Sequence, residues 1–159
     1  MSIKTWEMLS YIVTVVGLPL AIVIFLYEQR RERDHEEEAV YQLLSDNYQD
    51  FLKVTLANPD LRLFSAETTP ELSAEQRERM FIIFSMLISL FERAYLLLYR
   101  DDMTPRQLRR WGSWQDYMAE WCQREDFRVA LITQLRGEDP DFVQYLQSLA
   151  STDPAQPGG

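Results

Sequence analysis

The chain has 159 residues with 16 basic and 25 acidic side chains, so its net charge is −9, and such an acidic protein repels nucleic-acid phosphates in general. One cysteine, Cys122, excludes an intrachain disulfide, and together with one histidine, His35, it cannot complete a four-ligand zinc site. We therefore predict no metal and no cofactor, and the charge disfavours nonspecific nucleic-acid binding.

The N-terminal part of the sequence contains an apolar run, Leu9 to Tyr27, of 19 residues without a charge. As a helix this run would be roughly 28 Å long, close to the hydrocarbon thickness of a bilayer. It is too long for the apolar core of a typical signal peptide, and no small-residue cleavage site follows it. We expect residues 1–33 to form a retained transmembrane anchor with its basic flank, which makes the lipid bilayer the first predicted partner.

Basic residues on the two sides of this run indicate its orientation. Lys4 and the terminal amine precede the run, whereas Arg30, Arg31 and Arg33 follow it. Cytoplasmic flanks carry the larger share of basic residues in membrane proteins. We therefore expect a single-pass protein of the bacterial inner membrane, with its N-terminus outside and its C-terminal domain in the cytoplasm.

The small and hydroxyl-bearing residues of the apolar run fall on one helical face. Ser10, Thr14, Gly17 and Ala21 are spaced by four, three and four positions, and we name them the small-residue seam. In lipid, small residues let helix backbones approach closely, and hydroxyls can hydrogen-bond across the interface. We expect this seam to mediate homo-oligomerisation. The alternatives are that it lines a pore, or that common residue types share a face by chance.

Residues 34–150 are predicted to form an acidic helical bundle, and residues 151–159 a disordered tail. The anchor helix should continue as a charged stalk and then present an apolar face until Asn58-Pro59 ends it. That face consists of Val40, Tyr41, Leu44, Tyr48, Phe51, Leu52 and Thr55. Since no strand pattern occurs, the predicted fold is all-α: an N-terminal transmembrane helix that continues into a stalk and a small cytoplasmic helical bundle.

A second helix is predicted from Ser73, where Gln76 completes a capping box, to about Arg100. Its stretch 80–91 is apolar on all sides, so a second membrane span is an alternative. That stretch has only 12 residues, and Glu92-Arg93 would then lie in the bilayer at a cost of about 2.5 kcal/mol or more for each charge. We expect instead a fully buried central helix, covered in part by another subunit.

Three shorter helices should complete the bundle. Thr104-Pro105 begins the first of them, with Gln107 at the capping-box position. Asp126 is expected to cap the next helix, which should end at Gly137, and Asp139-Pro140 begins the last. The apolar positions expected on their inner faces are Leu108, Trp111, Trp114 or Gln115, Met118, Trp121, Cys122, Phe142, Tyr145, Leu146 and Leu149.

Basic and aromatic residues cluster at the start of the first of these three helices. Arg106, Arg109 and Arg110 precede Trp111 and Trp114. Rings beside cations can stack a base or a nucleotide, so one hypothesis is a ligand platform. The favoured interpretation is that the rings belong to the core and the arginines form a solvated first turn.

One short motif has catalytic precedent. Arg30 and His35 have an Arg-x4-His spacing, which resembles the signature of HEPN-type ribonucleases, where Arg and His act on the scissile phosphate across a dimer interface. The resemblance implies RNA cleavage by these two residues. Arg31 stands where that family usually has Asn or Asp, and a basic flank beside a membrane accounts for the arginines without catalysis. We predict no other catalytic residue.

Two resemblances concern the layout of the chain. Its aromatic pattern resembles a group of uncharacterised small bacterial membrane proteins with one N-terminal span and a helical cytoplasmic domain. The pattern is Phe91-Glu92-x-x-Tyr95-Leu96, Trp111-x-x-Trp114-x-x-Tyr117, Phe127-Arg128 and Asp141-Phe142-x-x-Tyr145. The order of anchor and domain, with the Arg30/His35 spacing, also resembles the membrane accessory proteins of type VI-B CRISPR systems. That second resemblance implies a pore and a role in antiviral defence.

Taken together, the sequence predicts a non-enzymatic, membrane-anchored, self-associating helical module that acts in signalling, recruitment or defence. A further protein is a candidate partner of its acidic domain. The first alternative is an oligomeric pore effector of antiviral or stress defence. The second alternative is a HEPN-like ribonuclease that uses Arg30 and His35.

Overall fold

The structure is a computed structural model that describes residues 3–65 and 67–151, with side chains described from residue 17 onward. Within these residues it contains five α-helices, one short 3-10 helix and no strand, so the all-α prediction is confirmed. The chain divides into two compact units, Met1–Val40 and Tyr41–Gly159. The side chains of Ser10 and Thr14, and the predicted tail from residue 152 onward, lie outside the described residues.

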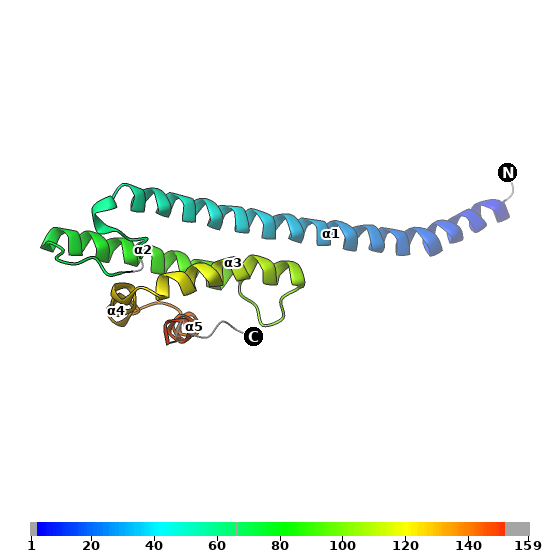
Figure 1. The fold of residues 1–159 in the computed structure, drawn as a ribbon. Helices are drawn as coiled ribbons and strands as arrows, with labels where there is room; N and C mark the ends of the chain where they lie inside the picture. Colours follow the sequence, from blue (N-terminus) through cyan, green and yellow to red (C-terminus); the bar gives the residue numbers. More distant parts are fainter. Residues whose placement is uncertain (1–2, 66, 152–159) are drawn as a thin grey trace. The chain divides into compact units, whose positions relative to one another are not determined.

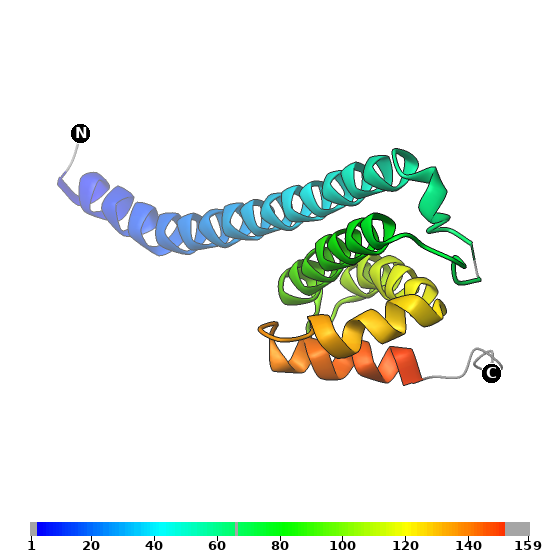
Figure 2. The same ribbon diagram turned by 90° about the vertical axis from the view of Figure 1, so that its left-hand side faces the viewer.

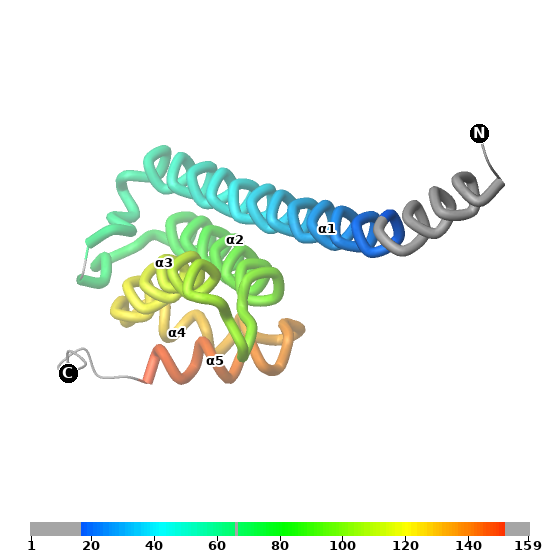
Figure 3. The backbone as a smooth tube through the Cα atoms, turned by 90° about the vertical axis from the view of Figure 1, so that its right-hand side faces the viewer, coloured from blue at the N-terminus to red at the C-terminus, as the bar shows by residue number. Residues whose placement is uncertain are grey.

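The first unit is the N-terminal part of helix α1, which spans Ile3–Leu56 and continues into the second unit. Figure 3 shows this helix without a break from residue 17 onward. Pro19 lies inside the helix without ending it. A proline removes one backbone donor and crowds the carbonyl four residues before it, and a helix tolerates this most readily in lipid. The prediction of one continuous helix from the apolar run into residues 34–56 is confirmed.

The second unit contains the last part of α1 and five further elements. These are η1 (Pro59–Leu61), α2 (Ala74–Leu98), α3 (Pro105–Cys122), α4 (Glu125–Gln134) and α5 (Pro140–Ser151). Helices α2 and α3 lie side by side, and α4 and α5 each contact both of them (Figure 1 and Figure 2). The end of α1 packs on α3, since Tyr48 contacts the ring of Trp114 and Phe51 contacts that of Trp121.

The predicted helix starts of α2, α3 and α5 are confirmed in atomic detail. At α2, the Gln76 amide N–H donates to the Ser73 hydroxyl, and the Ser73 N–H donates to the Gln76 side chain over 2.9 Å. Thr104 and Gln107 form the same capping box at α3. At α5, the Asp139 carboxylate accepts hydrogen bonds from two backbone N–H groups of the first turn. Each cap satisfies amides that have no partner within the helix.

Helix α4 differs from its prediction at both ends. Arg124, not Asp126, occupies the N-cap position, and the helix ends at Gln134 rather than at Gly137. The Asp126 carboxylate instead pairs with the Arg124 guanidinium over 2.6 Å. At the other end, the Gln134 side chain is hydrogen-bonded to Ser85 and to the carbonyl of Phe81 on α2. The Gln134 contacts with α2 coincide with the C-terminal end of α4, and Gly137 did not mark that end.

Within one chain α2 is not fully buried, because the helix has two apolar faces. Its predicted cover by another subunit stays a prediction. One face lies in the core, whereas Phe81, Ile82 and Met86 are 51%, 52% and 46% exposed. Helices α3, α4 and α5 contact α2 but leave Phe81, Ile82 and Met86 uncovered. Among the described residues α2 is the one helix that is long and apolar enough to cross a membrane, and 39% of its most apolar stretch is buried. Leu108 of α3, predicted to face inward, is also exposed.

Aromatic rings fill the core of the second unit in two connected groups. Trp121 lies at the centre of the first and makes edge contacts with Phe51, Phe84 and Phe64 at 5.4–6.3 Å between ring centroids. Trp111 lies at the centre of the second, which contains three tyrosines from α2 and α5. Burial of rings this large is the main source of stability for so small a bundle.

Candidate functional site

The first unit presents an uncovered apolar surface on α1. Eight large apolar side chains between residues 18 and 27 are 49–67% exposed. They are Leu18, Leu20, Ile22, Val23, Ile24, Phe25, Leu26 and Tyr27. Gly17 and Ala21 of the small-residue seam lie in the same stretch and are exposed as well. In water, each side chain of this kind forgoes about 1.5–3 kcal/mol that burial in an apolar medium would provide.

Arg30 and His35 are both exposed on α1, and they lie on different faces of the helix. Five positions at 100° each place them about 140° apart around the helix axis. A shallow hollow on α1 is lined by His35 together with Glu28, Arg31, Glu32, Glu36 and Ala39. The helix thus brings Arg31, one turn away, beside His35 and turns Arg30 elsewhere. Within one chain, the two residues of the HEPN-like spacing do not share a site.

The residues of the predicted ligand platform are divided between core and surface. Trp111 and Trp114 are 2% and 1% exposed, so protein atoms cover both ring faces. Arg106 and Arg109 are exposed, whereas the Arg110 guanidinium lies 5.1 Å from the centroid of the Tyr41 ring. A base could stack on these tryptophans only if the core opened. The structure therefore agrees with the interpretation of these rings as core residues.

Sequence reasoning missed a buried arginine, Arg124, which fastens the loop after α1 to the bundle. Its side chain is 4% exposed. One guanidinium nitrogen donates to the carbonyls of Arg62, Leu63 and Ser65, and the other two nitrogens donate to the Asp126 carboxylate over 3.0 and 2.6 Å. A buried charge requires such a complete set of partners. The sequence did contain one signal for this ion pair: Asp126 follows Arg124 by two residues at the start of a predicted helix.

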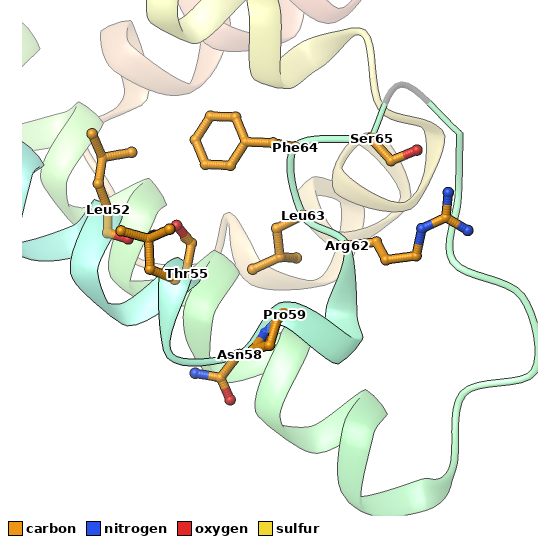
Figure 4. Close-up of a pocket in the computed structure, with 9 residues that line it drawn as sticks. Leu52, Thr55, Asn58, Pro59, Arg62, Leu63, Phe64 and Ser65 are labelled. Carbon is orange, nitrogen blue, oxygen red and sulfur yellow. Dashed lines mark hydrogen bonds between the residues drawn. The ribbon is translucent and has the colours of Figure 1, made fainter.

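The loop held by Arg124 forms one wall of an apolar groove of 530 Å³ (Figure 4). The groove is lined by Leu52, Thr55, Leu56, Asn58, Pro59, Arg62, Leu63, Phe64 and Ser65. Arg62 is the one residue among these whose side chain carries a charge, and the Thr55 hydroxyl already donates to the Leu52 carbonyl over 2.7 Å. The groove offers apolar contact surface and lacks the acid and base that catalysis requires.

In the described part of the chain Cys122 is a candidate nucleophile, and acidic, Cys and His side chains are candidate metal ligands. Burial raises the pKa of the Cys122 thiol to about 12, and Arg128 lowers it only in part. A thiol in that state is neutral near pH 7 and therefore a poor nucleophile. No group of three His, Cys, Asp or Glu side chains in residues 17–65 and 67–151 is placed to hold a metal ion.

The chain matches no protein-family model, no curated protein and no solved structure. The resemblances drawn from its aromatic pattern and from the Arg30/His35 spacing thus stay predictions. Function has to be argued from the surfaces and contacts of this chain alone.

Proposed function

We propose that this protein is a non-enzymatic helical module that α1 anchors in a membrane, where copies associate and present the acidic bundle to partners in signalling, recruitment or defence. The observation that supports the proposal is the exposed apolar surface of residues 18–27. Side chains of this kind occur together on a lone helix when a medium other than water surrounds them.

The length of the apolar run favours a membrane anchor over an apolar patch on the surface of a water-exposed helix. Residues 9–27 carry no charge, whereas residues 28–38 carry a charge at ten of eleven positions if His35 is counted with the others. Such an abrupt change from uncharged to charged residues is expected where a helix passes from the hydrocarbon core of a bilayer into the headgroups. The three arginines just after the run favour a cytoplasmic bundle, in accordance with the bias of basic residues.

Self-association is proposed for the same helix. In lipid, large apolar side chains gain nothing by leaving the acyl chains, so helices pair where small residues allow close packing. Gly17 and Ala21, both exposed, would provide that approach in the second half of the run. A helix pair on this face would extend into the stalk and bring several copies of the bundle together.

Membrane anchoring is tested by fractionation of the full chain and of a variant with Leu18→Asp and Ile22→Asp. We expect the wild type to stay in the membrane fraction after alkaline extraction and the variant to be released, because two carboxylates in mid-span cost about 5 kcal/mol or more. A matched control places aspartates at exposed apolar positions of the second unit, Leu43 and Ile132. Release of the wild type by alkali would refute the anchor.

Self-association is tested by replacing all four seam residues with leucine and measuring the mass of the detergent-solubilised chain. The oligomer should dissociate toward the monomer, because leucines keep the backbones apart. The control variant, Val16→Leu with Val23→Leu, adds bulk to the opposite face of the same helix. Equal masses for the seam variant and the control would contradict the proposed interface.

A further inference from the structure

A cavity of 690 Å³ lies where the end of α2, the α2–α3 connection and α5 meet. Three tyrosines line it: Tyr95 on α2, Tyr99 directly after the end of α2, and Tyr145 on α5. Its volume falls within the range of roughly 300–1,000 Å³ that is usual for small-molecule sites. Neither the apolar groove of Figure 4 nor the membrane anchor contributes to this cavity, so its role is a separate question.

The tyrosines form one continuous aromatic wall. Tyr95 and Tyr99 are stacked with their ring centroids 4.8 Å apart, and the Tyr145 ring lies 5.3 and 5.7 Å from them. The Tyr145 hydroxyl is buried, so the ring is the part of this side chain that borders the cavity. Trp111 packs behind all three rings and fixes the wall against the core. The faces of such rings attract cations.

The charged residues that line the cavity are four aspartates and one arginine. The arginine, Arg100, donates from one guanidinium nitrogen to the carbonyls of Leu96 and Tyr99 at the end of α2. Asp139 caps α5. The carboxylates of Asp101, Asp102 and Asp141 form no ion pair within the described residues. Burial raises the pKa of Tyr95, and the nearby Tyr99 and the carboxylates of Asp141, Asp139 and Asp101 add to the rise, which indicates that the wall faces negative charge.

The spacing of the carboxylates selects the kind of cation. In the described part of the chain no three acidic side chains converge closely enough to hold a metal ion, and this includes those around the cavity. A single small cation would therefore not be held by three of these carboxylates at once. A long cation with several separated charges could reach more than one carboxylate, and its methylene groups could lie on the tyrosine rings.

We propose that this cavity binds a linear polyamine. Its ammonium groups pair with Asp101, Asp102 and Asp141, and its hydrocarbon segments lie against Tyr95, Tyr99 and Tyr145. The site lies entirely within the second unit. The proposal therefore does not depend on membrane anchoring or self-association, and it gives the acidic bundle a specific small-molecule partner.

Calorimetric titration of the full chain with spermidine in detergent at about 0.15 M salt tests the proposal, because that salt screens unspecific attraction beyond roughly 8 Å. We expect saturable binding of one spermidine per chain. The double variant Asp101→Asn with Asp102→Asn, which changes exposed residues only, should weaken it about tenfold. Tyr99→Leu should weaken binding about fivefold, since a cation over a ring contributes on the order of 1 kcal/mol.

The matched control is Asp116→Asn with Glu120→Gln, which removes the same charge from exposed positions of α3 outside the cavity. Its affinity for spermidine should equal that of the wild type. Equal weakening in the control and in the Asp101/Asp102 variant would mean general attraction to an acidic protein and would overturn the proposal. Absence of saturable binding to the wild type, or displacement of spermidine by an equal concentration of magnesium chloride, would overturn it as well.

Discussion

The two units of this chain use apolar residues in opposite ways. In the first unit every large apolar side chain from Leu18 to Tyr27 is exposed, whereas in the second unit 22 apolar side chains are buried. Apolar content alone does not explain the difference, since α2 also contains an uncharged apolar stretch, residues 80–91. What differs is packing: α3, α4 and α5 contact α2, whereas the apolar side chains from Leu18 to Tyr27 stay 49–67% exposed.

Under the proposed function the two units depend on different media. The bundle is stabilised by excluding water from its own rings, so its stability should be sensitive to changes in packing. The first unit excludes water only when lipid or another copy covers it, so its side chains should contribute little to the stability of the bundle. Residue pairs of the same type, one from each unit, can test this distinction.

The largest effect is expected from a phenylalanine pair. Phe84 is 2% exposed and lies against Trp121 and Phe127, whereas Phe25 is 63% exposed. Phe84→Ala should lower the free energy of unfolding of the bundle by about 3–5 kcal/mol, because it removes buried area and leaves a cavity. Phe25→Ala should leave it unchanged.

Denaturant titration of tryptophan fluorescence measures both variants, since Trp111, Trp114 and Trp121 are all buried in the bundle. Comparable losses for Phe84→Ala and Phe25→Ala would show that the first unit contributes to the same folding transition. The distinction between the units would then fail.

The sequence predicted those features that depend on near neighbours in the chain. Ser73 with Gln76 and Thr104 with Gln107 were identifiable because a capping box is complete within four residues. The inward positions of α3 followed from their helical spacing, apart from Leu108, which lies near the helix start and is exposed.

Features that depend on contacts distant in the sequence could not be predicted. The carbonyls that Arg124 binds are 59 to 62 residues away in the chain. In the stretch 80–91 of α2 the polar residues are Ser85 and Ser89, which lie on the same side as the exposed Phe81, Ile82 and Met86. Two serines among ten apolar residues were too weak a signal to identify the face that the other helices leave open. The tyrosine cavity likewise joins the end of α2 to α5, and no spacing within either helix indicated that they meet.

A second, smaller effect is expected from an arginine pair. Arg124 is buried with five hydrogen bonds to side-chain and backbone oxygens, whereas Arg31 is an exposed residue of the first unit. Arg124→Ala should cost the bundle about 3 kcal/mol, because it leaves buried carbonyls and the Asp126 carboxylate without their partner. Arg31→Ala should have no effect.

Limited proteolysis adds a local measurement to the unfolding curves of these two variants. Cleavage at Arg62 should accelerate in Arg124→Ala, because the loop after α1 loses the contacts that fasten it. An Arg124→Ala variant with wild-type stability and unchanged cleavage would contradict the role assigned to this side chain.

The smallest effect concerns pH and an aspartate pair, Asp60 in the second unit and Asp34 in the first. Hydrogen bonds from Gln76 and Arg79 lower the pKa of Asp60 below its ordinary value of 3.8. In acid the unfolded chain therefore takes up a proton at Asp60 before the folded chain does. The stabilisation is complete above about pH 5 and is lost as the pH falls through the folded-state pKa. Because Asp60 is exposed to solvent, the effect should be small.

The melting temperature of Asp60→Asn should decline less than that of the wild type between pH 6 and pH 3, and Asp34→Asn should follow the wild type. Identical declines in all three proteins would show that the contacts of Asp60 with Gln76 and Arg79 do not persist in solution.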